Sequence, residues 1–95
     1  MNLPESNRNH KFIEFLMNNS EIFQNYFKEK YPVFYNSNIF LRDIQYSITS
    51  FYKSRNIQLG MAESEELALM YARYLESLQY LTKLDENTWK YNIKN

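Results

Sequence analysis

The side chains that could carry out chemistry are few in this sequence. His10 is the only histidine and therefore the only group expected to titrate near neutral pH without a perturbing neighbour. Acid–base work is conceivable there, but an exposed histidine at a helix start is the simpler interpretation. Glu63, Glu65 and Glu66 could offer oxygen ligands to a metal ion, yet the helix dipole alone favours acidic residues at the start of a helix.

Signatures of catalysis and of cofactor binding are missing from the sequence. The chain has no cysteine, which excludes disulfides, thiolate metal sites and cysteine nucleophiles. No serine or threonine stands in a motif that pairs a nucleophile with its base. Phosphate-binding loops need several glycines, and Gly60 is the only one. We therefore expect a protein that is not an enzyme and that binds no cofactor and no metal ion.

The length and charge of the chain narrow its class further. Its 95 residues suit a single domain, and 11 Lys and Arg balance 11 Asp and Glu. No apolar run approaches the ~20 residues that a membrane span needs, and residues 1–10 lack the pattern of a signal peptide. We expect a cytoplasmic protein without a membrane partner.

Aromatic residues are unusually frequent, with nine Tyr, seven Phe and one Trp. Each ring can bury roughly 150–250 Å², so this number exceeds what one small core usually holds. Some rings are therefore expected at the surface, where contiguous aromatic area marks a site for a partner. The alternative is that tyrosine hydroxyls reach water around an ordinary core.

Helical periodicity dominates the first half of the chain. Residues 1–8 show no apolar period and are expected to form a flexible arm, whereas residues 9–95 are expected to form one helical domain. The apolar spacing of residues 9–30 is helical, but polar residues 18–20 interrupt it, so this segment forms either one helix or two. A further helix is expected over residues 39–55.

The second half mixes helix and strand patterns. Residues 57–61 alternate apolar and polar side chains and predict a short strand with a bend at Gly60. Residues 61–78 carry a clear helical apolar stripe. Residues 80–93 hold two alternating segments around the turn at residues 85–87, which predicts a β-hairpin whose apolar face packs on the helices. The expected fold class is mainly α with a small C-terminal β-hairpin.

The order helix, helix, short strand, helix and two-stranded wing resembles that of winged-helix domains over residues 39–93. Residues 74–91 carry the likeness, because a leucine-rich helix end is followed there by a wing-like hairpin. In that family a glycine commonly ends the helix, where this chain has Gln79. The resemblance implies a winged-helix-like helical domain and, in DNA-binding members, a third helix that lies in the major groove.

The charge of this third helix argues against DNA binding. Residues 61–78 carry four glutamates against Arg73 alone, a net charge of −3, which the phosphates of a duplex would repel. A DNA-binding transcriptional regulator is therefore the alternative function, and it would have to use other surfaces. Its expected contacts are Arg8, Lys11, Arg42, Lys53, Arg55, Lys83 and Lys90.

The leading hypothesis is a small protein–protein interaction module: an accessory subunit, an adaptor or an inhibitor. Residues 31–35, Tyr-Pro-Val-Phe-Tyr, place four large apolar side chains around a proline, too many to bury in a short loop. These side chains either pack against the helices or bind a partner. The partner is another protein or a second copy of this chain. The acidic helix face would then steer a basic partner or keep the protein in solution. The expected anchors are Tyr31, Phe34, Tyr35, Tyr46 and Trp89.

Overall fold

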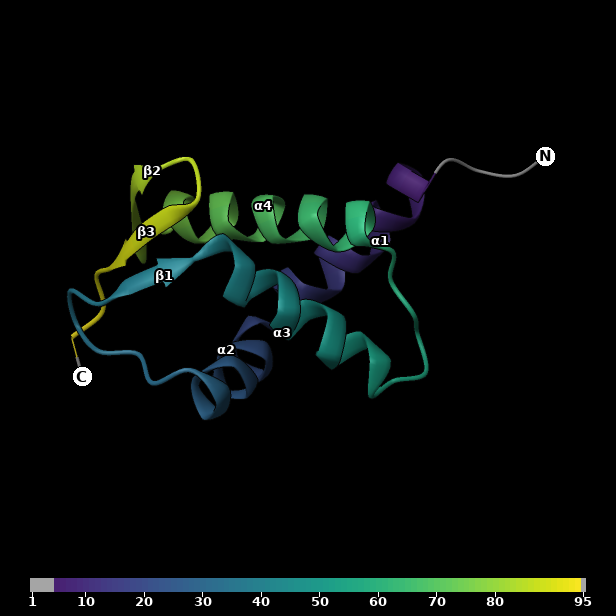
Figure 1. Ribbon diagram of the computed structural model, residues 1–95, viewed down its shortest axis with the longest axis horizontal. Coiled ribbons are helices and arrows are strands. Elements are labelled where there is room, and N and C mark those ends of the chain that lie inside the picture. Colours follow the sequence, from purple (N-terminus) through teal and green to yellow (C-terminus); the bar gives the residue numbers. More distant parts are fainter. Residues whose placement is uncertain (1–4, 95) are drawn as a thin grey trace.

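The computed structural model describes residues 5–94 and shows four helices and three strands there (Figure 1). This confirms the expected class, mainly α with a small sheet near the C-terminus. In chain order the elements are α1 (Glu5–Asn18), α2 (Ser20–Lys30), β1 (Asn38–Phe40), α3 (Leu41–Lys53), α4 (Met61–Ser77), β2 (Leu81–Asp85) and β3 (Thr88–Tyr91).

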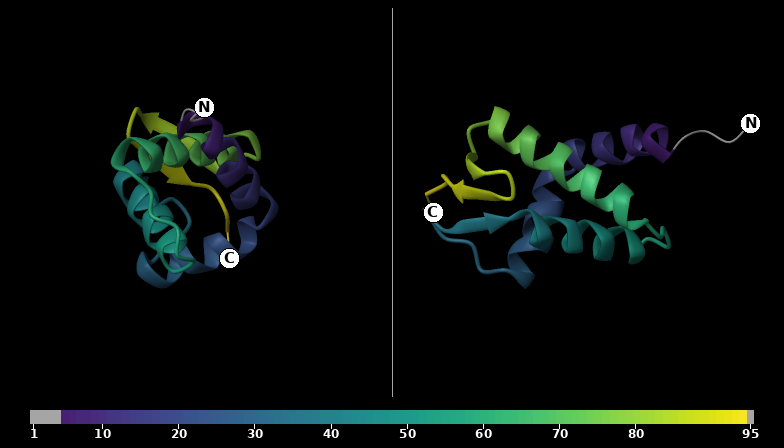
Figure 2. Two further views of the ribbon diagram at one scale, coloured as in Figure 1. Left: turned by 90° about the vertical axis from the view of Figure 1, so that its right-hand side faces the viewer. Right: turned by 45° about the horizontal axis from the view of Figure 1, so that its top comes forward.

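The first helical segment is divided in two at Asn19. The Asn19 side chain donates to the Phe15 carbonyl at 2.9 Å and so satisfies an acceptor at the end of α1. Ser20 begins α2 but does not cap it, because its hydroxyl lies 2.7 Å from the Tyr71 hydroxyl of α4. The break lets α1 pack mainly on α4, whereas α2 packs on α3 (Figures 1 and 2).

Rings from three helices meet at the centre of the core. Phe23 of α2 lies edge-to-face against Phe51 of α3, with ring centroids 5.4 Å apart, and against Tyr71 of α4 at 5.1 Å. All three residues are at most 2% exposed. Such edge-to-face pairs add about 0.5–1.5 kcal/mol each beyond the area that they bury. Many of the abundant aromatic residues are therefore accounted for by this core.

The sheet has three antiparallel strands in the order β1-β3-β2 (Figure 1). The hairpin of β2 and β3 confirms the prediction for residues 80–93, and its inner face packs on the helices through Trp89 and Tyr91. The predicted strand at residues 57–61 is wrong: residues 57–60 are irregular and Met61 begins α4. Leu59 is buried there in the core instead of pairing with a strand.

The third strand is β1, which precedes α3 instead of following it. Its central residue, Ile39, is buried and pairs with Trp89 of β3. Because residues 38–40 belong to the sheet, α3 starts at Leu41 and not at residue 39 as expected. The Leu41 N–H donates to the Asn87 carbonyl at 2.9 Å and ties the hairpin turn to the start of α3.

The flexible arm expected over residues 1–8 is only partly tested. Residues 1–4 lie outside the described residues, and residues 5–8 belong to α1, which begins before the residue 9 expected from the apolar spacing. The physical reason is that Arg8 contacts a buried carboxylate of α4, a partner 55 residues away in sequence.

Two helices end on residues other than glycine in the left-handed conformation, Asn56 (φ 63°) after α3 and Gln79 (φ 64°) after α4. After α4, the Tyr80 N–H donates to the Leu75 carbonyl and the Gln79 N–H to the Glu76 carbonyl, each at 2.9 Å. This is the Schellman pattern, in which glycine is the usual left-handed residue. Gly60, the only glycine, has a negative φ and precedes α4.

Candidate functional site

The segment from residue 31 to residue 37, which we call the aromatic loop, joins α2 to β1. Phe34 is 66% exposed and its neighbour Tyr35 is 46% exposed. Tyr31 is half-buried, because its ring packs on Phe27 with centroids 5.1 Å apart, and Val33 is half-buried against the core. Of the four large apolar side chains, two therefore face the core and two face solvent.

Hydrogen bonds fix the backbone of the aromatic loop. The Ser37 hydroxyl accepts from the Phe34 N–H at 3.0 Å and donates to the Phe34 carbonyl at 2.6 Å. The Asn36 N–H donates to the Tyr91 carbonyl at 2.8 Å, and the Tyr91 N–H donates to the Ser37 carbonyl at 2.9 Å. The loop is therefore attached to β3, so the loop itself would lose little conformational entropy when a partner binds.

One lysine contacts a ring of this loop, and a second contacts the β3 tyrosine that holds the loop. Lys94 Nζ lies 5.0 Å from the centroid of the Tyr35 ring. Lys28 Nζ lies 5.7 Å from the ring centroid of Tyr91, the residue whose backbone holds the loop. Both distances are in the range of cation–π contacts, so each ammonium group is placed beside a ring.

Tyr46 and Trp89 do not join the aromatic loop. Tyr46 is exposed on α3, where it shares a shallow groove with Phe40 and Met61 that no residue of the loop lines. Trp89 is 1% exposed in β3, and its indole N–H donates to Glu76 at 2.5 Å. Trp89 as a partner anchor is therefore wrong, because the packing of the hairpin on the helices buries its ring.

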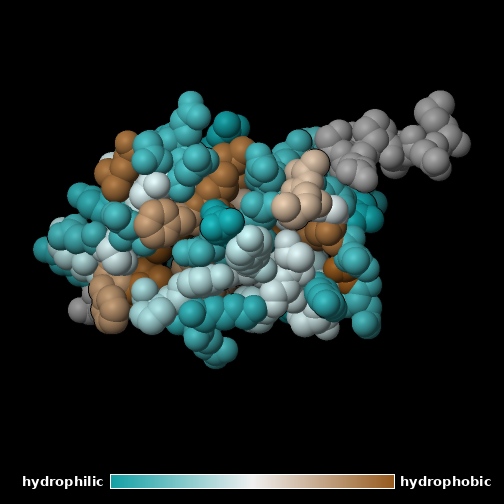
Figure 3. Space-filling model, viewed as in Figure 1, coloured by the Kyte–Doolittle hydropathy of each residue, from teal (hydrophilic) through white to brown (hydrophobic). Residues whose placement is uncertain are grey.

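Sequence reasoning missed two exposed apolar side chains beside Tyr46, namely Phe40 (46% exposed) and Met61 (76% exposed). The outward position of Phe40 follows from the alternation along β1, a strand that the sequence pattern did not reveal. Asp43 also lines this groove, and partial burial raises the pKa of its carboxyl, opposed by the nearby Arg42. On the face drawn in Figure 3, apolar side chains form several separate areas among hydrophilic ones.

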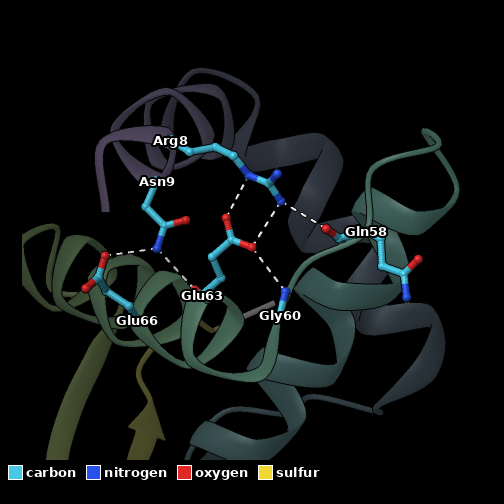
Figure 4. Close-up of polar contacts among 6 residues, drawn as sticks. All are labelled: Arg8, Asn9, Gln58, Gly60, Glu63 and Glu66. Atoms are coloured by element: carbon cyan, nitrogen blue, oxygen red, sulfur yellow. Dashed lines mark hydrogen bonds and ion pairs between the residues drawn. The ribbon is translucent and has the colours of Figure 1, made fainter. Parts of the chain in front are cut away.

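A polar cluster, which we call the polar clasp, joins α1 to the start of α4 (Figure 4). Its members are Arg8, Asn9, Gln58, Gly60, Glu63 and Glu66. Glu63 lies at its centre and is 4% exposed. Arg8 Nε lies 2.7 Å from Glu63 Oε2, while Arg8 Nη2 and the Gly60 N–H donate to Oε1 at 3.0 and 3.1 Å.

The other contacts of the polar clasp also join distant segments. Arg8 Nη2 donates to the Gln58 carbonyl at 2.9 Å. Asn9 Nδ2 donates to the Glu63 carbonyl at 3.2 Å and to Glu66 Oε1 at 2.9 Å. The buried Asn9 Oδ1 accepts no hydrogen bond among residues 8–94, so the clasp is not fully paired. Because its contacts tie α1 to Gln58, Gly60 and the first turns of α4, we assign the clasp to holding α1 on α4.

These contacts change the expected acidic face of α4. Glu63 is buried, Glu66 accepts from α1, and Glu76 accepts from Trp89, whereas Glu65 is exposed. The expectation that the glutamates form one solvated acidic face is therefore wrong for Glu63. Within the described part of the chain, no three His, Asp or Glu side chains gather closely enough to hold a metal ion.

The cations expected to contact DNA are separated in space. Arg8 pairs with Glu63, and the guanidinium carbon of Arg55 lies 3.9 Å from the centroid of the Phe51 ring. The end of α3, which precedes Arg55, and the hairpin lie at opposite ends of the long axis (Figure 1). Arg42 lies over the Tyr46 ring at 5.8 Å. The remaining four are exposed or half-buried, and they come from α1, α3, β2 and β3: Lys11, Lys53, Lys83 and Lys90.

The core contains a cavity of about 40 Å³ between α2, α4 and the sheet. Phe23, Ile39 and Tyr71 line it with Tyr91, whose buried hydroxyl has no hydrogen-bond partner among residues 8–94. A few water molecules fill such a volume, whereas sites for cofactor-sized ligands measure ~300–1,000 Å³. We therefore assign no ligand to this cavity.

No helix among the described residues is long and apolar enough to span a bilayer. Comparisons with models of known protein families, with curated proteins and with solved structures found no match to this chain.

Proposed function

We propose that this protein is a non-enzymatic, cytoplasmic protein–protein interaction module whose contact surface is the aromatic loop. The observation that carries this proposal is the exposure of the adjacent rings of Phe34 (66%) and Tyr35 (46%) on a backbone held by hydrogen bonds to β3. Large rings on a fixed frame are typical interface anchors, because they bury much area at a low entropic cost.

The groove that contains Tyr46 is a second, less favoured contact surface. It holds Tyr46 together with Phe40 and Met61, but the charged side chains of Arg42 and Asp43 line it as well. We keep Tyr46 as a separate surface to be tested on its own.

We further propose a winged-helix-like classification for the domain. The support is that a two-stranded hairpin directly follows α4 and packs against it. The resemblance assumed a short strand between the last two helices, whereas β1 lies before α3.

Co-purification tests the proposed function. Tagged wild-type protein is compared with the double variant Phe34→Ala and Tyr35→Ala and with Ile22→Ala, which removes a similarly exposed apolar side chain (54%) from α2. We expect partners identified by mass spectrometry to be retained by wild type and Ile22→Ala and lost by the double variant. Equal capture by all three proteins would contradict the proposal.

Sedimentation velocity on the same proteins shows whether the partner is a second copy. If the aromatic loop joins two copies, the wild type sediments as a dimer and the Phe34→Ala and Tyr35→Ala variant as a monomer. Tyr46→Ala is measured alongside, because it removes the exposed ring of the other surface. A dimer that dissociates only with Tyr46→Ala would assign self-association to the groove instead.

A further inference from the structure

The chain around the aromatic loop carries an excess of positive charge. Residues 28–38 and 88–94 contain four lysines and one acidic residue, Glu29. The two segments lie together, because the backbone of Tyr91 is hydrogen-bonded to Asn36 and Ser37. The molecule is neutral as a whole, so this end is distinguished by its local charge.

Lys94 lies beside the exposed ring of Tyr35, and Lys28 lies beside the ring of Tyr91, whose backbone holds the loop. Within residues 8–94, neither lysine forms an ion pair with a carboxylate. The ion pair found there joins Arg8 and Glu63. The Tyr35 ring lies under the Lys94 ammonium and the Tyr91 ring under that of Lys28. A ring occupies one side of an ammonium group and leaves its other sides open to anions.

We propose that the aromatic loop recognises an acidic peptide segment of another protein, in which apolar side chains alternate with Asp or Glu. The apolar side chains would pack on Phe34 and Tyr35, and the carboxylates would meet Lys28 and Lys94. This inference rests on the proposed function and adds the chemistry of the partner. It differs in sign from one of the two roles considered for the acidic helix face, which was to steer a basic partner; the other was to keep the protein in solution.

The geometry favours an acidic peptide over single-stranded nucleic acid. Base stacking needs open ring faces along a positively charged groove that follows the phosphate backbone. Here Lys94 covers a face of Tyr35, and the exposed Phe34 stands on a short connecting loop. The adjacent cations are lysines, which act as point charges and lack the bidentate geometry of arginine.

Calorimetric titration with designed peptides tests this inference. The probes are a synthetic peptide of about twelve residues that alternates Glu with Leu and Phe, and an analogue with Gln in place of each Glu. We expect the acidic peptide to bind at low salt and the Gln analogue to bind about tenfold more weakly, with the difference reduced at high salt. Lys28→Gln with Lys94→Gln should weaken the acidic peptide about tenfold, whereas Lys11→Gln with Lys53→Gln, at exposed sites elsewhere, should not.

The outcomes separate the two proposals. Equal binding of both peptides that is lost with Phe34→Ala would overturn the acidic preference and leave the aromatic loop as an interaction site. Binding that is indifferent to Phe34→Ala and Tyr35→Ala would overturn the proposed function as well. Failure of both peptides to bind at millimolar concentration, or tighter binding of a single-stranded DNA of similar length through Lys28 and Lys94, would overturn the inference. Far-UV circular dichroism verifies that each variant is folded.

Discussion

Glu63 shows at the residue scale how a charged side chain becomes part of the interior. Its carboxylate is 4% exposed and is accommodated by the guanidinium of Arg8 and the N–H of Gly60. A buried ion pair adds little net stability, but removal of one partner leaves an uncompensated charge. The burial of the Glu63 carboxylate therefore depends on Arg8 as its cation.

We predict that Arg8→Ala lowers the free energy of unfolding by about 1–3 kcal/mol, because Glu63 then lacks its cation. Urea unfolding followed by circular dichroism measures the change. Lys11→Ala, at an exposed site on the same helix, is the control and should change it by less than about 0.5 kcal/mol. Glu63→Gln should restore part of the stability in the Arg8→Ala background, since a neutral amide is less costly to bury. Equal effects of Arg8→Ala and Lys11→Ala would mean that the clasp does not stabilise the fold.

Two buried tyrosines predict how stability responds to alkaline pH. Burial raises the pKa of Tyr71 and that of Tyr52 from 10.0 to about 12 each. The unfolded chain therefore loses these protons first, so the contribution of the two tyrosines to stability is constant below about pH 10 and is lost between about pH 10 and 12. For Tyr71 the loss is on the order of 2–3 kcal/mol, since one pKa unit corresponds to about 1.4 kcal/mol.

Urea midpoints at pH 8, 10 and 11 check this prediction. Tyr71→Phe should reduce the alkaline loss, although it also gives up the hydrogen bond to Ser20 and so costs about 0.5–1.5 kcal/mol at pH 8. Tyr46→Phe removes an exposed hydroxyl and should leave the profile unchanged. An identical decline in wild type and Tyr71→Phe would show that Tyr71 does not contribute to it.

At the scale of elements, two helix ends contain backbone strain that a substitution by glycine would relieve. Gln79 adopts φ 64° to close α4, a conformation that costs an L-residue about 1–2 kcal/mol relative to glycine. Asn56 does the same after α3 at a lower cost, because asparagine tolerates this region better.

We predict that Gln79→Gly stabilises the protein by about 0.5–1 kcal/mol, the relief of strain being partly offset by the entropy of glycine in the unfolded chain. Asn56→Gly should have a smaller effect. Arg73→Gly, at an exposed position inside α4, is the control and should destabilise by about 1 kcal/mol. Thermal melting measures all three, and destabilisation by Gln79→Gly would contradict the strain argument.

For the whole molecule, balanced charge and separated cations predict weak affinity for duplex DNA. We expect no mobility shift of a random duplex at low salt, because salt-dependent affinity requires several cations to contact phosphates together. Binding that falls steeply with salt and weakens with Lys83→Ala or Lys90→Ala would instead favour the DNA-binding regulator.

The parts of the fold that local patterns determine were predictable from the sequence. Helical spacing located most of α1 to α4, and alternation around residues 85–87 located the hairpin. By contrast, β1 is three residues long and exists because it pairs with β3, about fifty residues later. The contact between Arg8 and Glu63 likewise leaves no local pattern, since it joins residues 55 positions apart.

The candidate site was also only partly predictable, because some of its features depend on contacts between distant parts of the chain. A proline among large side chains in a short connection indicated that some rings must face solvent, and Phe34 and Tyr35 do so. Alternation along β3 could not exclude Trp89 as an anchor, because burial of that face depends on how the hairpin docks on α4. Lys94 and Tyr35 are far apart in the chain, so only the fold brings the Lys94 ammonium beside that ring.

The burial of Trp89 gives the molecule an intrinsic optical probe. It is the only indole in the chain, and it lies in β3, where its N–H donates to Glu76 of α4. Its emission should be blue-shifted in the native protein and should move to longer wavelength when the hairpin separates from α4. Detachment of the sheet can thus be timed separately from the melting of α1, without any added label.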